Sequence, residues 1–334
     1  MKFYKMMFSL TLTTSILITI SSISWVTAWA GLEMNLLSIL PMMKNFKNKF
    51  SSEATIKYFI TQTIASTMMI FSILFFSNMK MFSFHSETPM MYLILSSLLL
   101  KMGAAPLHFW LPEVISGLSW NLTMTVLTIQ KMAPMILTSY TTIANNLTMM
   151  TILTSATISG IIGMNQTCLR KIMTYSSINN IGWMLSALMM SNSLWLMYFL
   201  TYTLITLSIT VPFNLNKMMF IPQLTKLSNN KMSLLIMMMN FLSLGGLPPF
   251  TGFMPKWITI YMLSTKAMFY LTITLILATL TTLFMYLRLM LPMAMMHMNK
   301  SMKLKTTTIS KKMTTLNMIS LLGMPFFMMT IQLF

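Results

Sequence analysis

The sequence contains very little acidic charge and almost no cysteine. Only four of its 334 residues are aspartate or glutamate, one is cysteine, and charged residues make up 8% of the chain. Soluble domains carry about 25% charged residues, so this composition excludes an ordinary soluble fold. The one cysteine, Cys168, excludes an intramolecular disulfide, and no CxxC pair or His/Cys cluster offers a zinc, haem or iron–sulfur site. We therefore expect any redox chemistry to take place in other proteins.

Long uncharged stretches take the place of the missing charge. Hydrophobic residues make up 56% of the chain, and the mean hydropathy is +0.73. Most of the uncharged stretches approach the roughly 20 residues that cross about 30 Å of hydrocarbon. We predict an all-α polytopic membrane protein with about eleven transmembrane helices. Their expected ranges are 6–24, 26–43, 58–78, 89–110, 119–140, 149–164, 172–190, 194–215, 231–263, 268–290 and 316–334.

The basic residues outside these spans test the assignment independently, because lysine and arginine concentrate on the side from which a membrane protein is inserted. If there are eleven spans, all but two of these basic residues fall on one side of the membrane, and only Lys80 and Lys266 fall on the other. This pattern places the amino terminus on the insertion side and the carboxyl terminus opposite. The net charge of +18 then follows from topology, and we expect no nucleic-acid binding.

Two predicted spans are interrupted by glycine and proline close to a lysine. The fourth contains Gly103 and Pro106, and the ninth contains Gly246 and Pro249. Proline removes a backbone donor, and the backbone groups freed by a break are tolerated inside a membrane where they line a polar cavity. If spans one to five and spans six to ten are copies of one unit, each break lies in the fourth span of its copy. Because five is odd, the second copy would run inverted, as in many secondary transporters.

We therefore expect two inverted five-helix repeats with broken helices at spans four and nine. Their expected boundaries are residues 1–140 and 141–292, and a basic loop with a final helix would follow at 293–334. The repeat is inferred from the placement of the breaks alone, because the two halves show no clear similarity residue by residue.

Four charged residues lie within the predicted spans: Glu33, Lys101, Lys131 and Lys256. A charge at the bilayer centre costs roughly 2.5 to 3.5 kcal/mol on insertion scales, and such residues usually serve ion or proton movement. Burial disfavours the charged form of a lysine, whereas a nearby carboxylate favours it. Movement of Glu33 relative to Lys101 would therefore switch that lysine between holding and releasing a proton. We take the four residues as candidates for proton translocation.

Structural alternatives remain open for these side chains. The side chain of Lys101 would extend along its helix and place the ammonium group at the membrane–water interface. Lys131 lies near the middle of its span, where the same extension is harder. Lys256 would neutralise carbonyls freed by the break or a lipid phosphate, and Glu33 would pair with a lysine of a neighbouring subunit. We expect His108 to be packed or hydrogen-bonded rather than to relay protons. Other acidic residues and histidines fall in or near predicted loops and are expected to be solvated: Glu53, His85, Glu87 and Glu113.

Several long motifs resemble a known family. The segments GLEMN (31–35), LKMGAAPLHFWLPEV (100–114), QKMAP (130–134), GMNQTCLRKIMTYSSI (163–178) and LGGLPPFTGFMPKW (244–257) are similar to the subunit 2 family of mitochondrial NADH:ubiquinone oxidoreductase, respiratory complex I. The resemblance runs from Gly31 to about Arg288. Length and span number resemble the animal form, and the 45 methionines fit an invertebrate mitochondrial gene.

This resemblance implies an antiporter-like subunit of the membrane arm of a respiratory NADH dehydrogenase, which moves protons from matrix to intermembrane space. In the family, a glutamate and a lysine of the first repeat form an ion pair, a second lysine is central, and a third lies on the broken helix of the second repeat. Glu33, Lys101, Lys131 and Lys256 match those positions in that order.

The resemblance also implies where the rest of the chemistry is. NADH, FMN, the iron–sulfur clusters and ubiquinone would be bound by partner subunits, and this chain would bind no cofactor and have no redox active site of its own. Expected partners are other membrane-arm subunits and inner-membrane lipids, with cardiolipin as a candidate. The location would be the mitochondrial inner membrane, with the amino terminus in the matrix and the carboxyl terminus in the intermembrane space.

One departure from the family concerns Asn180, which aligns where relatives often carry a histidine after Tyr175-Ser176-Ser177. Asparagine does not titrate near neutral pH, so water held by Asn180, Ser176 and Ser177 would have to bridge the gap. Two other functions remain open. The chain would be a free-standing cation/proton antiporter, or a scaffold whose charges only hold helices together.

Overall fold

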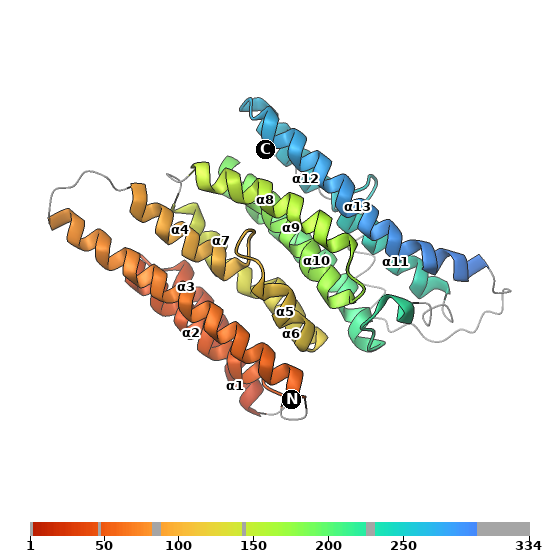
Figure 1. Ribbon diagram of the computed structural model, residues 1–334, viewed down its shortest axis with the longest axis horizontal. Helices are drawn as coiled ribbons and strands as arrows, with labels where there is room; N and C mark the ends of the chain where they lie inside the picture. The colour runs from red at the N-terminus through yellow and green to blue at the C-terminus, as the bar shows by residue number, and fades with distance from the viewer. Residues whose placement is uncertain (1–2, 46–47, 82–87, 142–144, 225–230, 299–334) are drawn as a thin grey trace. The chain divides into compact units, whose positions relative to one another are not determined.

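The computed structural model describes residues 3–45, 48–81, 88–141, 145–224 and 231–298, and its regular elements in these ranges are helices (Figure 1). No strand occurs within these ranges, where an isolated antiparallel bridge pairs Cys168 with Phe220. The predicted all-α class is therefore confirmed. The helix predicted at 316–334 lies outside the described residues.

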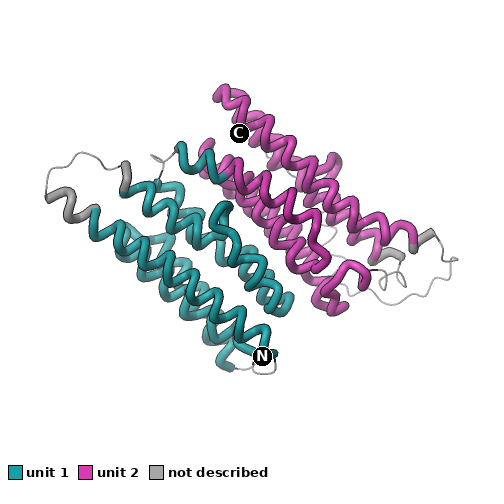
Figure 2. Tube along the Cα trace, in the orientation of Figure 1, with its two compact units in different colours: residues 1–151 teal, residues 152–334 magenta. Residues whose placement is uncertain are grey.

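Two compact units make up the chain, residues 1–151 and 152–334 (Figure 2). The first unit contains α1 (Phe3–Ile20), α2 (Trp25–Met43), α3 (Lys49–Met81), α4 (Thr88–Met102), α5 (Trp110–Gly117), α6 (Trp120–Leu127) and α7 (Ile129–Ser139). Helix α8 (Asn145–Met164) begins in the first unit and continues in the second. The second unit also contains α9 (Leu169–Met190), α10 (Asn192–Leu215), α11 (Lys231–Gly245), α12 (Phe253–Thr265) and α13 (Phe269–Met298).

Seven of the predicted spans each correspond to a single helix, namely α1, α2, α3, α8, α9, α10 and α13. Within the described residues, six helices are long and apolar enough to cross a membrane: α1, α2, α3, α8, α10 and α13. Helix α9 is long enough but is absent from that group. Its polar residues, described below, lower its hydropathy.

Three predicted spans are interrupted. The helix predicted at 89–110 ends at Met102, and α5 begins only at Trp110 and continues beyond the predicted span to Gly117. The span at 231–263 becomes α11 and α12, and both breaks fall at the glycine and proline residues that predicted them. The span at 119–140 was expected to be one helix, but it is interrupted at Thr128, where φ is −116° and ψ is −74°. The Thr128 hydroxyl donates to the carbonyl of Met124 at 2.8 Å, a local bond of the kind that bends helices.

In the first unit, α3 packs against α2, α4 and α5, while α7 packs against α1, α4 and α6. A hydrophobic cluster joins α2, α3, α4 and α7 and consists of Ala28, Leu32, Met69, Ile94, Leu98, Ala133 and Leu137. Three of these residues, Leu32, Leu98 and Ala133, lie within one turn of Glu33, Lys101 and Lys131, respectively. The apolar contacts that fix these helices therefore also position the charged residues.

In the second unit, α9 is the enclosed helix. It contacts α10, α12 and α13, and Gly182 on α9 lies against Ser155 of α8. Nearly every side chain from residue 172 to residue 187 is buried. The buried side chains include hydroxyl and amide groups, namely Thr174, Ser176, Ser177, Asn179, Asn180 and Ser186. Helix α9 thus supplies a polar interior to the unit.

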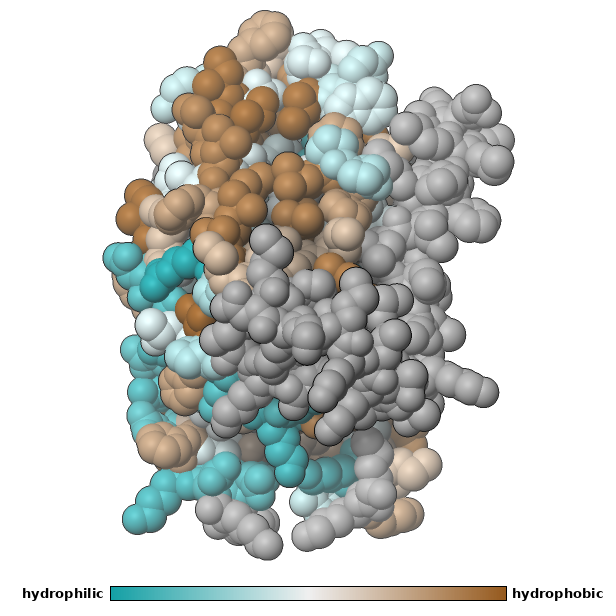
Figure 3. All heavy atoms as spheres, turned by 90° about the vertical axis from the view of Figure 1, so that its right-hand side faces the viewer, coloured by the Kyte–Doolittle hydropathy of each residue, from teal (hydrophilic) through white to brown (hydrophobic). Residues whose placement is uncertain are grey.

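The helix faces turned away from these interiors carry large hydrophobic side chains. Leu17, Phe71, Leu200, Leu277 and Phe284 are each more than half exposed. On the face drawn in Figure 3, hydrophobic side chains form a broad band, and hydrophilic ones gather beyond one end of it. Exposed apolar surface of this extent is typical of contact with lipid.

Candidate functional site

The two breaks predicted from the sequence have the same length and the same local structure. They comprise residues 103–109 and 246–252, seven residues each. Each begins with a glycine at positive φ, +74° at Gly103 and +77° at Gly246, and each contains a cis peptide bond, before Pro106 and Pro249. The N–H of the glycine donates to the carbonyl three residues back, and the next N–H donates to the carbonyl five residues back, at 3.0 to 3.3 Å. This pair of bonds is the Schellman motif.

The Schellman motif requires a left-handed residue, which glycine adopts without the cost of a Cβ. It satisfies two of the four carbonyls at the end of a helix. The carbonyls of the last two helical residues, 101 and 102 in α4 and 244 and 245 in α11, are left for other donors. Each break therefore presents partial negative charge at the end of the preceding helix.

Lys256 occupies this position in the second unit. It is the fourth residue of α12, is 6% exposed, and its Nζ reaches back across the break to donate to the carbonyls of Leu244 at 3.2 Å and Gly245 at 3.0 Å. The same Nζ lies 5.9 Å from the centroid of the Trp183 ring, within the range of a cation–π contact. The structural reading of Lys256 as a group that neutralises freed carbonyls is confirmed, and its role in carrying protons stays a prediction.

A small polar cavity adjoins Lys256. Its volume is about 10 Å³, which is room for about one water molecule. The lining residues are Asn180, Tyr198, Thr201, Tyr202, Ile205, Ser243, Leu244, Gly252, Pro255 and Lys256.

Several residues that line this cavity are held by hydrogen bonds within α9 and between α9 and α10. The Tyr198 hydroxyl donates to Asn180 Oδ1 at 3.0 Å, and Asn180 Nδ2 donates to the Ser176 carbonyl at 2.9 Å. Tyr202 is hydrogen-bonded to Ser177. The Ser176 and Ser177 hydroxyls also donate to carbonyls of their own helix, those of Met173 and Thr174, and the bridging water expected at Asn180, Ser176 and Ser177 stays a prediction. Sequence reasoning missed the two tyrosines. Their position on a predicted span was the only signal for them.

In the first unit, Glu33 and Lys101 lie on α2 and α4. Lys101 is the penultimate residue of α4 and is 7% exposed, so it is buried in the chain rather than extended to a surface. Glu33 acts electrostatically on Lys101. Within the described residues no ion pair shorter than 4 Å joins them, since the two ion pairs found there both involve Lys57. Glu33 Oε1 is buried and accepts no hydrogen bond from a described residue.

Lys131 is the third residue of α7, is 2% exposed, and lies directly after the interruption at Thr128. The neighbouring Gln130 joins three helices, because its Nε2 donates to Asn35 Oδ1 on α2 at 2.8 Å and its Oε1 accepts from the Tyr58 hydroxyl on α3 at 3.3 Å. Sequence reasoning missed these partners, although Asn35 and Gln130 lie in the motifs quoted above. All three buried lysines therefore lie within one turn of a helix interruption.

Other sequence-based expectations have mixed outcomes. His108 is 1% exposed, its Nδ1 lies 3.2 Å from the Pro106 carbonyl, and its ring stacks on Phe109, which confirms that it is packed and hydrogen-bonded. Glu53 and Glu113 are exposed as expected, and they lie near the starts of α3 and α5, next to the preceding loops. Both pair with Lys57, at 2.8 and 2.9 Å. His85 and Glu87 lie outside the described residues.

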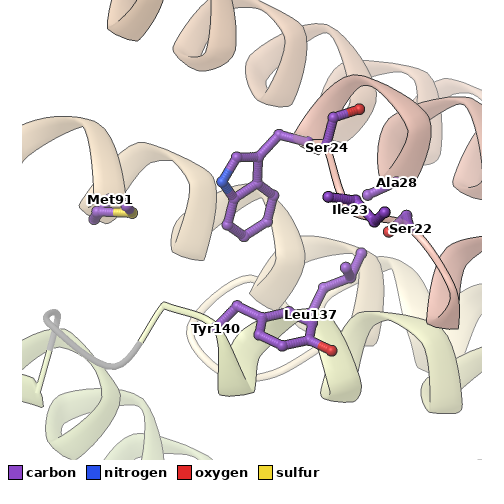
Figure 4. Close-up of a pocket in the computed structure, with 8 residues that line it drawn as sticks. Ser22, Ile23, Ser24, Ala28, Met91, Leu137 and Tyr140 are labelled. Atoms are coloured by element: carbon purple, nitrogen blue, oxygen red, sulfur yellow. The ribbon is translucent and has the colours of Figure 1, made fainter.

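A separate pocket of about 320 Å³ lies in the first unit (Figure 4). It is lined by Ser22, Ile23, Ser24, Trp25, Ala28, Met91, Leu137 and Tyr140. In Figure 4, Leu137 and Tyr140 face the turn that contains Ser22 and Ser24 across the pocket. None of the four charged candidates lines it, so it is not part of the site built around them.

Comparison with known proteins identifies the family of this chain. Residues 22–284 match the family described as NADH:quinone oxidoreductase/Mrp antiporter, transmembrane. The chain belongs to this family. Chain 2 of NADH-ubiquinone oxidoreductase from Anopheles gambiae is 45% identical over 311 residues, which cover 91% of this chain and 89% of that one. The corresponding protein from Locusta migratoria is 38% identical over 320 residues, which cover 96% and 94%.

Solved structures of the antiporter family share the fold. A chain of respiratory complex I from Thermus thermophilus matches with a TM-score of 0.81 at 19% identity, over 96% of this chain and 79% of that one. A chain of the Mrp complex from Dietzia matches with a TM-score of 0.77 at 15% identity, over 84% and 59%. At this level of identity the likeness establishes the fold, and the function has to be argued from the site.

Proposed function

We propose that this chain is subunit 2 of the membrane arm of respiratory NADH:ubiquinone oxidoreductase and that it translocates protons across the mitochondrial inner membrane. Its relatives from mosquito and locust, which are similar over nearly their whole length, support this assignment. The observation that carries the transport function is the burial of Lys101, Lys131 and Lys256, which are 7%, 2% and 6% exposed, each beside a helix interruption. Membrane proteins retain such costly charges mainly where ions or protons pass.

The proposed translocation residues are Glu33, Lys101, Lys131 and Lys256. In the first unit, Glu33 and Lys101 interact without a closed salt bridge, so a small displacement would change their interaction strongly. At an effective dielectric constant near 20, two unit charges about 4 Å apart interact by roughly 4 kcal/mol. That energy is ample to switch a lysine between holding and releasing a proton. Lys131 in the first unit and Lys256 in the second are the other proposed proton carriers.

The proposed architecture has eleven spans in two inverted five-helix repeats, residues 1–140 and 141–292, with the last span at 316–334. The identical length of the two breaks and their shared Schellman motif support the repeats. Inversion follows from the odd number of spans in each repeat.

The proposed orientation places the amino terminus in the matrix and the carboxyl terminus in the intermembrane space. Cys168, which is partly exposed between α8 and α9, would then lie on the matrix side. A membrane-impermeant maleimide should label this cysteine in inverted inner-membrane vesicles but not in intact mitoplasts. The opposite labelling pattern would reverse the proposed orientation.

Redox groups belong to the partners in this proposal. NADH, FMN, the iron–sulfur clusters and ubiquinone would be bound by other subunits of the complex, which drive the proton movement. Within the described residues no group of three or more histidine, cysteine, aspartate or glutamate side chains could hold a metal ion. Other membrane-arm subunits and inner-membrane lipids, with cardiolipin as a candidate, would surround the chain.

Single substitutions of the lysines test the function. Lys101→Met, Lys131→Met and Lys256→Met keep an unbranched side chain one atom shorter than lysine and remove its protonatable group. In assembled complex reconstituted into vesicles, each should lower NADH-driven proton translocation more than it lowers assembly. Wild-type translocation in all three variants would refute the proposal and favour a scaffold. Exchange of sodium for protons by the purified chain in liposomes would instead indicate a free-standing antiporter.

A further inference from the structure

One face of α3 is tied to the end of α4, where the first break begins. Tyr58 and Gln62 lie one turn apart on this face and are 2% and 5% exposed. Gln62 Nε2 donates to the Lys101 carbonyl at 3.4 Å. The Tyr58 and Trp110 rings meet edge-on with their centroids 5.8 Å apart, and Trp110 Nε1 donates to the Leu100 carbonyl at 3.1 Å. Two carbonyls in the last turn of α4 are therefore held by α3, directly or through Trp110.

The same face of α3 also reaches α2, the helix that carries Glu33. The Tyr58 hydroxyl donates to Gln130 Oε1 at 3.3 Å. Gln130 Nε2 in turn donates to Asn35 Oδ1 at 2.8 Å, and Asn35 lies two residues after Glu33 on α2. Tyr58 and Gln62 thus connect the turn that carries Glu33 with the turn that carries Lys101.

The donors at the first break are neutral, whereas the second break uses a lysine. The Lys101 carbonyl accepts from an amide, and the Leu244 carbonyl, which also lies two residues before the glycine of its break, accepts from the ammonium of Lys256. Neutral donors hold the end of α4 without adding a charge beside Glu33. No described residue accepts a hydrogen bond from Lys101 Nζ. The interaction of this ammonium with Glu33 therefore depends on where α2 and α4 are held.

We propose that Tyr58 and Gln62 are positioning residues for the pair of Glu33 and Lys101. This inference rests on the proposed function and adds two residues to the same site. The interaction energy of two charges varies inversely with their distance. By holding the end of α4 and, through Gln130, the turn of α2, the two side chains of α3 fix that distance. Without them α4 shifts relative to α2, and the carboxylate no longer acts on the lysine with its normal strength.

Removal of both donors tests the proposal. The variant Tyr58→Phe/Gln62→Leu keeps the size of both side chains nearly unchanged. At equal amounts of assembled complex it should translocate protons roughly fivefold more slowly than the wild type, because two bonds that hold the pair are lost. The control is Thr61→Val on the same helix, whose hydroxyl bonds to carbonyls of α3 itself, those of Lys57 and Tyr58. Thr61→Val should translocate protons at the wild-type rate.

A cycle with Glu33→Gln distinguishes positioning from a general loss of stability. If the α3 side chains act through the pair, Tyr58→Phe/Gln62→Leu should reduce translocation by less than about twofold once the carboxylate is gone. The same factor of reduction with and without Glu33 would show that the α3 contacts only stabilise the fold, and it would overturn the proposal.

An electron cryomicroscopy map of the assembled variant gives a readout that does not depend on activity. The distance from the Glu33 carboxylate to Lys101 Nζ should differ from the wild-type distance in Tyr58→Phe/Gln62→Leu and should equal it in Thr61→Val. An unchanged distance in the double variant would overturn the proposal. If the double variant does not assemble, Tyr58→Phe alone takes its place in all three tests, with an expected reduction of translocation of roughly twofold.

The outcomes separate this inference from the proposed function. If Lys101→Met abolishes translocation while Tyr58→Phe/Gln62→Leu translocates protons at the wild-type rate, the positioning role is wrong and the proposed function stands. If Lys101→Met itself translocates protons normally, the role of Lys101 fails, and this inference fails with it.

Discussion

Gly246→Ala is the sharpest test of how the broken helix controls Lys256. Gly246 has a φ of +77°, and a Cβ added there would lie 2.8 Å from Lys256 Cδ and 3.0 Å from Nζ. The left-handed backbone conformation costs an alanine about 1 to 2 kcal/mol. The added methyl group would also push the ammonium from its carbonyls, and a hydrogen bond to a charged group is worth about 1.5 to 3 kcal/mol.

We therefore expect Gly246→Ala to destabilise the chain by about 3 to 5 kcal/mol if one such bond is lost, and to lower NADH-driven proton translocation in the complex that still assembles. Stability is measured by thermal unfolding of the detergent-solubilised complex, and translocation by acidification in vesicles. Gly245→Ala is the matched control. Its φ is not positive, and an added Cβ would meet Tyr286 at an ordinary 3.5 Å, so both quantities should stay near wild type.

A double-variant cycle decides whether Gly246 acts through the lysine. If it does, Gly246→Ala combined with Lys256→Met should translocate protons no worse than Lys256→Met alone. Wild-type translocation by assembled Gly246→Ala enzyme would refute the reasoning, because it would mean that Lys256 works equally well away from the carbonyls of Leu244 and Gly245.

Two further predictions concern the first unit. Glu33→Gln should lower proton translocation with little effect on assembly, because it removes the carboxylate that acts on Lys101. The control is Glu53→Gln, the same change at an exposed residue, which should not lower translocation. Equal translocation by both variants would contradict the role of Glu33. Tyr58→Phe should lower the free energy of unfolding by about 1 kcal/mol, because the hydrogen bond to Gln130 is lost. Chemical denaturation measures this free energy, and an unchanged value would show that the bond contributes nothing.

The breaks at Gly103 and Gly246 were predictable because glycine and proline interrupt helices by known local chemistry. The interruption at Thr128 was not, since no glycine or proline lies there and Pro134 is inside the regular part of α7. Threonine usually continues a helix, and whether its hydroxyl bends the chain depends on the packing around it.

The partners of the buried charges were predictable only in part. Side chains that meet across helices are far apart in sequence, such as Gln130 with Asn35, which are 95 positions apart. Hydropathy and motif spacing identify which residues are inside a span, but the rotation of each helix decides which of them meet. The same limit explains why Tyr198 and Tyr202 were missed beside Asn180, whose importance the sequence did indicate.

The two breaks share their length and their Schellman motif, but the lysines near them do not align in sequence. The two segments can be aligned on Gly103 and Gly246, the glycines that begin the breaks. Lys101 then corresponds to Leu244, since each lies two residues before its glycine, and Lys256 corresponds to Glu113, since each lies ten residues after it. The lysines therefore occupy different sequence positions. Nevertheless, Lys256 Nζ lies at the carbonyls of residues 244 and 245, the end of α11, just as Lys101 itself lies at the end of α4. In the second unit the ammonium of Lys256 meets the negative end of the helix before the break, and in the first unit the basic residue Lys101 lies in the last turn of that helix.

If the position of this charge matters more than the residue that supplies it, the lysine can be moved. The variant Leu244→Lys/Lys256→Met places the lysine at the position equivalent to Lys101, beside the same cavity, since Leu244 also lines it. It should translocate protons faster than Lys256→Met at equal assembly. Leu275→Lys/Lys256→Met, with the new lysine at a buried residue of α13, is the control and should show no such gain. An assembled Leu244→Lys/Lys256→Met enzyme that is no faster than Lys256→Met would show that the reach of Lys256 across the break is itself required.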